Sequence, residues 1–190
     1  MEFTTRIMDR YPIVRTVRRI RMGESELYKL MRLASLRESP FAFGSTYESA
    51  VQRSPESWAE QADSTAQGSD RSTFIALCGD VPIGIAALYR TGEGSDVGEL
   101  VQVWVAPEQR SQGVAIDLMD AVFEWAGANG FRTVVAGVTK ENARALRFYR
   151  KHGFAPAKRA PTGGPDDQVV LAKAVEDARA ADALPHGDDV

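Results

Sequence analysis

Residues 97–129 constrain the fold more than any other stretch, because they predict a strand that is followed at once by a helix. Every second residue of 101–105 is a valine, which is typical of a strand and predicts one over residues 97–106. Pro107 ends this strand, since proline has no N–H to donate to a ladder. Over residues 115–129 the apolar side chains recur at spacings of three and four, as on one face of a helix.

The turn between this strand and this helix, residues 110–115, has the features of an anion-binding site. It carries small residues at Ser111, Gly113 and Ala115. The first N–H groups of a helix have no partner within the helix, and the positive end of the helix dipole lies behind them. Such a turn can therefore hold a group such as pyrophosphate, and a glycine allows the phosphate to approach the backbone. The residues alone leave an ordinary strand-to-helix turn as the alternative.

Two motifs in this half of the chain resemble those of the GNAT N-acetyltransferases. Residues 110–115 read arginine-x-x-glycine-x-alanine, which is similar to the acetyl-CoA signature of that family. Residues 142–154 begin with an asparagine, contain phenylalanine-tyrosine and end with glycine-phenylalanine, which is similar to the second signature of the family. Both motifs stand in the expected order and at the expected separation, and the resemblance is sharp over residues 99–154.

The order of the predicted elements is strand, two helices, three strands, helix, strand, helix and two strands. They are a strand at 13–22, helices at 25–37 and 48–64, strands at 73–78, 83–89 and 97–106, a helix at 115–129, a strand at 133–139, a helix after Asn142 that Gly153 closes, and a hairpin of 154–160 with 168–172 around a turn at 163–165. The strand–helix–strand unit in the middle favours parallel pairing, and the hairpins favour antiparallel pairing.

We therefore expect an α/β fold with one mixed, mostly antiparallel sheet and helices on both faces. The resemblance implies the acyl-CoA N-acyltransferase type of this fold, in which a central parallel pair of strands splays apart, here 97–106 and 133–139. Residues 13–173 are expected to form a single domain, preceded by a flexible N-terminus (1–12) and followed by a tail (174–190).

Composition narrows the class of protein. The net charge of -3 gives no support for a nucleic-acid partner, although the arginines of residues 15–21 make that stretch locally basic; we expect them to form a solvated face. A single cysteine excludes an internal disulfide framework. No apolar run is long enough to span a membrane, no cluster has metal-ligand spacing, and the expected location is cytoplasmic. A homodimer is an expectation from the fold class, without a located interface.

The resemblance implies a set of contacts with acetyl-CoA as co-substrate. The backbone amides of the turn would bind the pyrophosphate, the strand would pair with the pantetheine amides as an added strand does, and an asparagine would support the same arm. The residues concerned are Val103, Val105, Arg110, Ser111, Gln112, Gly113, Val114, Ala115 and Asn142. For Asn142 a role as helix cap is an equal interpretation, and the two roles are compatible.

Two residues are candidates for the proton transfers of an acetyl transfer to an amine. Tyr149 matches the family residue that protonates the leaving thiolate or donates a hydrogen bond to it; the alternative is a core tyrosine beside Phe148. Glu99 lies near the start of the central strand, where some members of the family have a glutamate base that acts directly or through water. The alternative for Glu99 is a surface carboxylate.

The acceptor site is expected in the apolar, aromatic segment of residues 39–47. Phe41, Phe43, Ser45 and Tyr47 are the candidate substrate contacts, because this region shapes the acceptor site in the family that the chain resembles. Core packing of the segment, or a lid, is the alternative interpretation. The sequence does not identify the amine that would be acetylated.

The sequence thus favours an enzyme that moves an acetyl group from acetyl-CoA to a primary amine by direct attack. A non-catalytic acyl-CoA sensor or partner-binding module on the same fold would show the same cofactor motif, and the presence of both Glu99 and Tyr149 favours the enzyme. An unrelated phosphate-binding enzyme is less consistent with the residues, because the chain has no glycine-lysine-serine/threonine phosphate loop.

Overall fold

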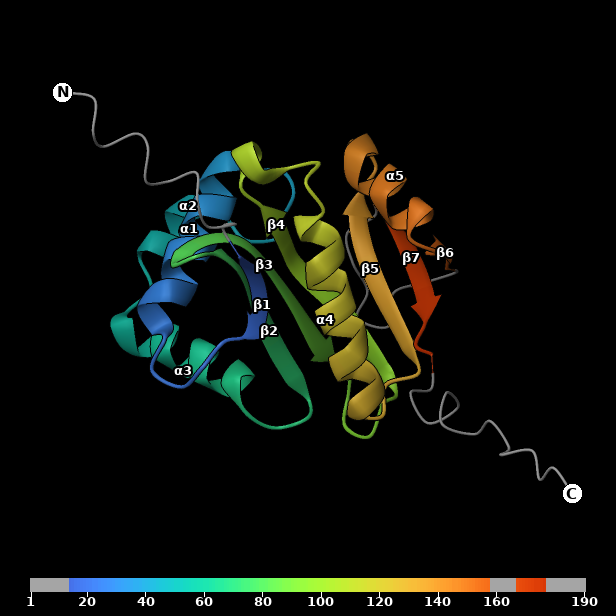
Figure 1. Cartoon of the computed structure of the whole chain (residues 1–190), viewed down its shortest axis with the longest axis horizontal. Helices are drawn as coiled ribbons and strands as arrows, with labels where there is room; N and C mark the ends of the chain where they lie inside the picture. The colour runs from blue at the N-terminus through green and yellow to red at the C-terminus, as the bar shows by residue number, and fades with distance from the viewer. Residues whose placement is uncertain (1–13, 158–166, 177–190) are drawn as a thin grey trace, which may run out of the picture.

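An open sheet of seven strands runs through the part of the chain that the computed structural model describes, residues 14–157 and 167–176 (Figure 1). The spatial order of the strands is β1-β2-β3-β4-β5-β7-β6. Their bounds are Arg15–Arg19 (β1), Arg71–Cys78 (β2), Val81–Arg90 (β3), Val97–Val105 (β4), Thr133–Thr139 (β5), Ala155–Pro156 (β6) and Gln168–Ala174 (β7). All neighbouring pairs are antiparallel except β4 and β5, which are parallel.

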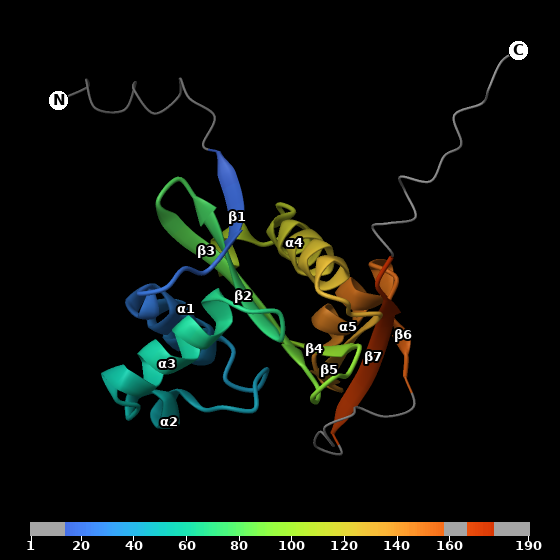
Figure 2. The same cartoon turned by 90° about the horizontal axis from the view of Figure 1, so that it is seen from below.

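Helices cover both faces of this sheet (Figure 2). They are α1 (Ser25–Glu38), α2 (Tyr47–Val51), α3 (Pro55–Ala66), α4 (Val114–Ala128) and α5 (Ala143–Lys151), with a short 3₁₀ helix η1 (Pro107–Gln109) between β4 and α4. The mixed sheet with its parallel pair and flanking helices confirms the expected fold class. None of the helices in the described ranges combines the length and the apolar character that crossing a bilayer requires.

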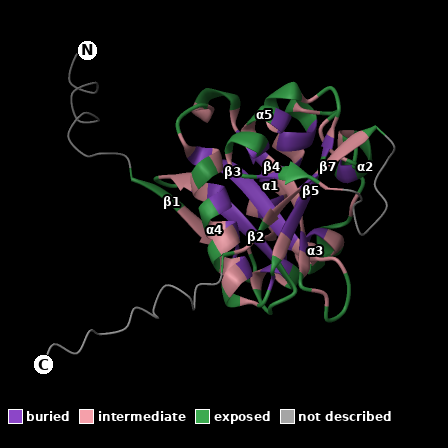
Figure 3. Ribbon diagram, turned by 90° about the vertical axis from the view of Figure 1, so that its right-hand side faces the viewer, coloured by how far each residue is buried: buried purple, intermediate pink, exposed green. Residues whose placement is uncertain are grey.

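Two hydrophobic cores lie on opposite faces of the sheet, and Figure 3 shows the buried strands between them. The helices α1 and α3 contribute Tyr28 and Trp58 to one core, and their rings meet edge to face at 5.9 Å. The helices α4 and α5 contribute Leu118 and Tyr149, among others, to the second core. Each helix is therefore fixed by burial of one apolar face, which is the main source of helix stability in a folded protein.

The parallel pair separates soon after it begins. The ladder between β4 and β5 extends from Val97↔Thr133 to Glu99↔Val135, and β4 then continues to Val105 in contact with β3 alone. Strand β5 pairs with β7 along its whole length instead. The splayed pair that the sequence resemblance implied is thus present, with its apex at Glu99.

A bulge in β4 disturbs the alternation of its side chains. Between the pairs Ile85↔Trp104 and Ala87↔Val101, β4 contains one more residue than β3. Gln102 lies in the bulge with φ 60°, in the left-handed region that few residues other than glycine adopt. The strict alternation expected for this strand is wrong across the bulge, because an inserted residue reverses the faces that the following side chains occupy.

Most other predicted elements have the expected type, with shifted ends. The helical stretch at 48–64 is two helices, α2 and α3, and the hydroxyl of Ser54 caps α3 by accepting a hydrogen bond from Ser57 N at 3.3 Å. The turn of the last hairpin at 163–165, the N-terminal 1–12 and the end of the tail lie outside the described residues.

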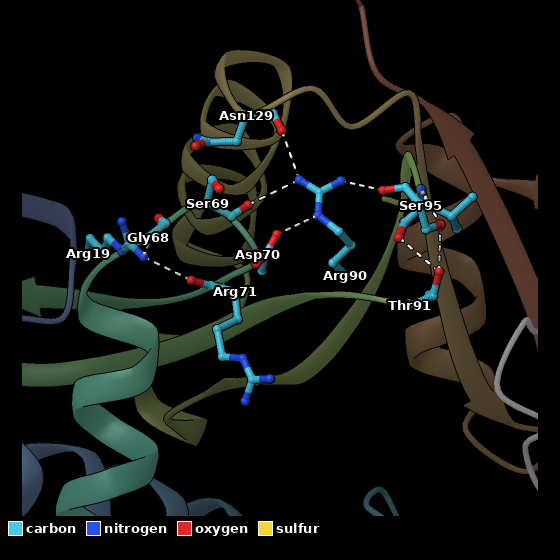
Figure 4. Close-up of polar contacts among 10 residues, drawn as sticks. Arg19, Gly68, Ser69, Asp70, Arg71, Arg90, Thr91, Ser95 and Asn129 are labelled. Carbon is cyan, nitrogen blue, oxygen red and sulfur yellow. Dashed lines mark hydrogen bonds and ion pairs between the residues drawn. The ribbon is translucent and has the colours of Figure 1, made fainter. Parts of the chain in front are cut away.

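Arg90 joins three segments at the end of the sheet where β4 begins (Figure 4). Its Nε donates to Asp70 Oδ1 at 2.8 Å, and its Nη2 donates to the carbonyl of Asn129 at 2.9 Å. The guanidinium carbon also lies 4.0 Å from the ring centroid of Phe131. One side chain therefore holds the segment before β2, the end of β3 and the end of α4 together.

We expect Gly98→Ala to destabilise the fold. A Cβ at Gly98 would lie 2.9 Å from carbons of both Leu88 and Phe131, so the core of the α4 face would have to shift. The free energy of unfolding, measured by urea denaturation, should fall by about 1–3 kcal/mol. Gly92→Ala is the matched control, because no atom lies within 4 Å of a Cβ there. An equal stability of the two variants would contradict the close packing at Gly98.

Candidate active site

A cavity of about 670 Å³ opens where β4 and β5 separate. Its size is that of a typical small-molecule site. Its walls come from both hydrophobic cores: Val105 and Val114 belong to the α4 face, and Trp104 and Phe43 belong to the α1 face. The cavity is therefore accessible to groups from both sides of the sheet.

Residues 110–115, which we call the amide turn, form one end of this cavity. Gly113 adopts φ 89°, a conformation that favours glycine, and its carbonyl accepts hydrogen bonds from the N–H groups of Ile116 and Asp117. No side chain of the described residues caps the start of α4 at Gly113. The first amides of a long helix have no partner within the helix, and an uncapped set of them is suited to an anion.

The structure places nearly all of the predicted cofactor contacts around the cavity. They are Val103, Val105, Arg110, Ser111, Gly113, Val114, Ala115 and Asn142. Gln112 is not part of the lining; its side chain donates to the carbonyl of Glu108 at 2.8 Å. Asn142 caps α5 by accepting a hydrogen bond from Ala145 N at 3.1 Å, so the capping interpretation is correct and the residue also faces the cavity.

The guanidinium of Arg110 is engaged with the protein itself. Its Nε donates to the carbonyl of Val105 at 2.9 Å, and its Nη2 pairs with the carboxylate of Glu38 at the end of α1. Trp104 Nε1 donates to the same carboxylate at 3.0 Å. Because Glu38 compensates its charge, Arg110 is suited to hold the amide turn in place more than to add charge to it.

The carboxylate of Glu38 is held in its charged form. Burial opposes the ionisation of Glu38, but the hydrogen bonds from Arg110, Ser39 and Trp104 outweigh it and lower the pKa to about 2. No local feature of the sequence indicates a role for Glu38, because a helical pattern does not show which distant side chains meet the last residue of the helix.

Arg15 on β1 supports the amide turn from the other side. Its Nη1 donates to the carbonyl of Gln112 at 2.6 Å, and its Nε pairs with Asp117 on α4 at 2.7 Å. The solvated face expected for the arginines of 15–21 is correct in part, because Arg15 and Arg21 are exposed whereas Arg18 and Arg19 are half-buried. Arg18 pairs with Glu24, and Arg19 donates to the carbonyl of Thr65 in α3.

Tyr149 lies on the cavity wall in an apolar environment. Its ring packs edge to face against Phe154 at 5.1 Å and against Phe148 at 5.5 Å. Burial raises the pKa of the Tyr149 phenol, so the hydroxyl stays protonated at neutral pH. The structure thus provides a hydrogen-bond donor at this wall of the cavity.

Glu99 lies on the opposite face of the sheet from Tyr149. It stands directly opposite Tyr89 in the β3–β4 ladder, so the two side chains share a face. Tyr89 is on the α1 face, because its hydroxyl accepts a hydrogen bond from Gln102 Nε2 at 3.2 Å and Gln102 also accepts one from Tyr28 of α1 at 3.1 Å. Glu99 is half-buried at the apex of the splay and is not part of the cavity lining.

The four candidate acceptor contacts are separated in the structure. Phe43 lines the cavity, whereas Phe41 is 90% exposed and Ser45 is exposed on the loop. Tyr47 begins α2, and its hydroxyl and ring contact Arg37 outside the cavity. Sequence reasoning missed Tyr28, Tyr89 and Gln102 on this side, because only the bulge and the packing of α1 bring them together.

We expect the stability difference between wild type and Glu38→Gln to depend on pH. A carboxyl whose pKa is lower in the folded protein stabilises it fully above its unfolded pKa of 4.5, and loses this effect as the pH falls toward 2. The difference in the free energy of unfolding should be at most ~1 kcal/mol at neutral pH, because Glu38 is partly exposed, and should shrink in acid.

Urea denaturation between about pH 7 and pH 3 measures this difference. Glu60→Gln, which changes an exposed glutamate on α3, is the matched control. A difference that does not vary with pH would show that the charge of Glu38 is unimportant.

Comparisons with known proteins agree with this geometry. The chain is 34% identical over 85 residues to an N-acetyltransferase of Methanocaldococcus jannaschii, and these residues make up 43% of this chain and 38% of that protein. It is 40% identical over 72 residues to the N-acetyltransferase Rv2669 of Mycobacterium tuberculosis, and these residues make up 38% of this chain and 45% of that protein. The matched region thus spans less than half the length of these relatives.

Solved structures show the same fold. The PaiA N-acetyltransferase from Thermoplasma acidophilum, in complex with coenzyme A, superposes with a TM-score of 0.68 at 16% identity, covering 85% of this chain and 99% of that one. A GCN5-related N-acetyltransferase from Kribbella flavida gives a TM-score of 0.67 at 22% identity, covering 86% and 99%. The sequence pattern of the Acetyltransferase (GNAT) family matches residues 32–154, which is more than half of the chain. This chain therefore belongs to the GNAT acetyltransferase family.

Proposed function

We propose that the chain transfers an acetyl group from acetyl-CoA to a primary amine by direct attack. The observation that carries the proposal is the amide turn, which no side chain of the described residues caps and which forms one end of the cavity that Tyr149 lines. A pyrophosphate at the amide turn would direct the rest of the donor into the cavity between β4 and β5. The coenzyme A complex of the T. acidophilum neighbour supports this assignment.

The pantetheine arm would follow the edge of β4 that β5 leaves unpaired. From Leu100 onward β4 pairs with β3 alone, so its other edge can pair with the amides of an extended ligand as a further strand would. Val103 and Val105 lie on the cavity wall along this edge, and Asn142 faces it from the start of α5. The thioester would then reach the apex of the splay.

In the reaction, the amine nitrogen attacks the thioester carbonyl carbon, the C–N bond forms and the C–S bond breaks. Glu99 would accept a proton from the acceptor ammonium, directly or through water, from the α1 face. Tyr149 would donate a hydrogen bond to the leaving thiolate from the α4 face, and the thiolate would take up the proton that the attacking nitrogen loses, so that coenzyme A leaves as the thiol. Because burial raises the pKa of Tyr149, hydrogen-bond donation is more favourable for this residue than complete loss of its proton.

Gly113→Asp is expected to abolish acetyl-CoA binding. A Cβ at Gly113 would lie 3.3 Å from Nη2 of Arg15, and the left-handed backbone at φ 89° would be strained, so the amide turn would lose the shape that a pyrophosphate needs. Isothermal titration calorimetry should show at least about a hundredfold weaker binding. Gly130→Asp is the matched control, because Gly130 is also left-handed, at φ 77°, and follows the other end of α4.

Equal binding by both of these variants would contradict the assignment of the amide turn. A folded wild type that binds no acetyl-CoA would contradict the proposed function as a whole.

Tyr149→Phe and Glu99→Gln are each expected to lower kcat with an amine acceptor by about a hundredfold or more, because each loses a group that assists proton movement. Release of coenzyme A thiol measures turnover, and acetyl-CoA binding by calorimetry should stay within about threefold of wild type, since neither change touches the amide turn. Glu60→Gln is a matched control for the change of a glutamate. Unchanged turnover in both variants would contradict the mechanism.

The same assay separates the enzyme from an acyl-CoA sensor on this fold. A sensor would bind acetyl-CoA and release no thiol when amines are added, whereas the proposed enzyme releases thiol in proportion to the amine that is acetylated.

A further inference from the structure

Arg32 on α1 is a buried cation that has no anionic partner among the described residues. Its side chain is 6% exposed, and it is the one arginine in the described residues that is buried to this degree. Its contacts there are a hydrogen bond from Nη1 to Ser35 Oγ at 3.2 Å and the ring of Phe43, whose centroid lies 5.1 Å from the guanidinium carbon. Within residues 14–157 and 167–176, no carboxylate lies within ion-pair distance of it.

Other arginines in the described residues form ion pairs, unlike Arg32. Arg15, Arg18, Arg90 and Arg110 each pair with an aspartate or a glutamate, although all four are more exposed than Arg32. A buried charge is expected to be paired, because desolvation penalises it. That penalty lowers the pKa of Arg32, Tyr28 and Tyr89 raise it in part, and the nearby charge of Arg53 lowers it again. The site therefore has a strong preference for an added anion.

The groups around Arg32 form a polar cluster on the acceptor side of the sheet. The hydroxyls of Tyr28 and Tyr89 are close enough to influence the charge of Arg32, and both bond to the side chain of Gln102 in the β4 bulge. Glu99 shares this face of the sheet with Tyr89. Tyr89, Gln102 and Glu99 are each half-buried, so solvent or a ligand can reach the cluster.

The cluster is adjacent to the cavity. Phe43 lines the cavity, and the guanidinium of Arg32 packs against the same ring. The planar guanidinium has several N–H groups in a fork, and the hydrogen bond to Ser35 uses one of them. A carboxylate is the anion that matches this fork with two parallel hydrogen bonds.

We propose that Arg32 binds a carboxylate of the acceptor, so that the acceptor is a small amine that also carries a carboxylate. This inference rests on the proposed acetyl transfer. The carboxylate of the acceptor pairs with the buried guanidinium of Arg32, and the amino group of the acceptor extends toward Glu99 at the apex of the splay. The positive charge of Arg32 at one end of the site complements the carboxylate of such a molecule, and the carboxylate of Glu99 at the other end complements its ammonium group.

The test compares pairs of amines that differ in this one group. Each free amino acid of a standard panel is assayed beside its carboxamide, with acetyl-CoA as donor and thiol release as readout. For the amino acid that the enzyme acetylates best, the wild-type kcat/KM for the free acid should exceed that for its carboxamide by a factor of about 10–100. This factor corresponds to the usual free energy of a hydrogen bond to a charged group.

Substitution of Arg32 should remove this preference. In Arg32→Met the ratio should fall to about one, mainly through a higher KM for the acid, and Arg32→Lys should give an intermediate ratio because it keeps the charge and loses the fork. Arg21→Met, at an exposed arginine before α1, is the matched control and should keep the wild-type ratio. Thermal melting and acetyl-CoA binding verify that each variant is folded.

The outcomes are distinct. Equal or better turnover of the amides by wild type, or an unchanged ratio in a folded Arg32→Met, would overturn this inference and leave the acetyl transfer standing. Failure of every amine to release thiol from a protein that binds acetyl-CoA would contradict the proposed function, and this inference with it. If Arg32→Met does not fold, the ratio of wild type and that of Arg32→Lys decide the question.

Discussion

The separation of β4 from β5 after Glu99 is the constraint on which the rest of the structure depends. Parallel strands normally continue their ladder, because an unpaired backbone edge must find other partners. Here β5 pairs fully with β7, and β4 pairs with β3, so the sheet consists of two halves joined by a short parallel segment. The cavity lies in the resulting gap, with α4 beginning at one end of it.

Polar contacts between distant segments hold this gap in shape. The ion pair of Glu38 with Arg110 ties the end of α1 to the amide turn, and Arg15 ties β1 to the same turn through Gln112 and Asp117. The groups on the acceptor side and the amide turn are therefore parts of one framework. In the proposed reaction, the contacts that position the amide turn for the donor would therefore also position the α1 face for the amine.

The sequence determined much of the fold and the location of the amide turn. Element type follows from local patterns, such as the helical spacing after Gly113 and the cap at Ser54, which depend on neighbouring residues and are visible without the tertiary structure. The predicted cofactor contacts come from two short motifs, because a turn and a helix start can bind an anion through backbone groups whose placement is local. The catalytic roles of Glu99 and Tyr149 stay predictions.

Only the tertiary structure determined which side chains from distant segments contact one another on each face of the sheet. The bulge at Gln102 reverses the alternation of β4, and no local pattern indicates it; with it come the contacts of Tyr28 and Tyr89. The structure also placed Phe43, but not Phe41, at the cavity, and it left Arg32 buried with no carboxylate of residues 14–157 and 167–176 beside it. The physical reason is that these features depend on the register between strands and on helix packing, which join residues far apart in the chain, whereas the sequence specifies the backbone of each segment mainly through its neighbours.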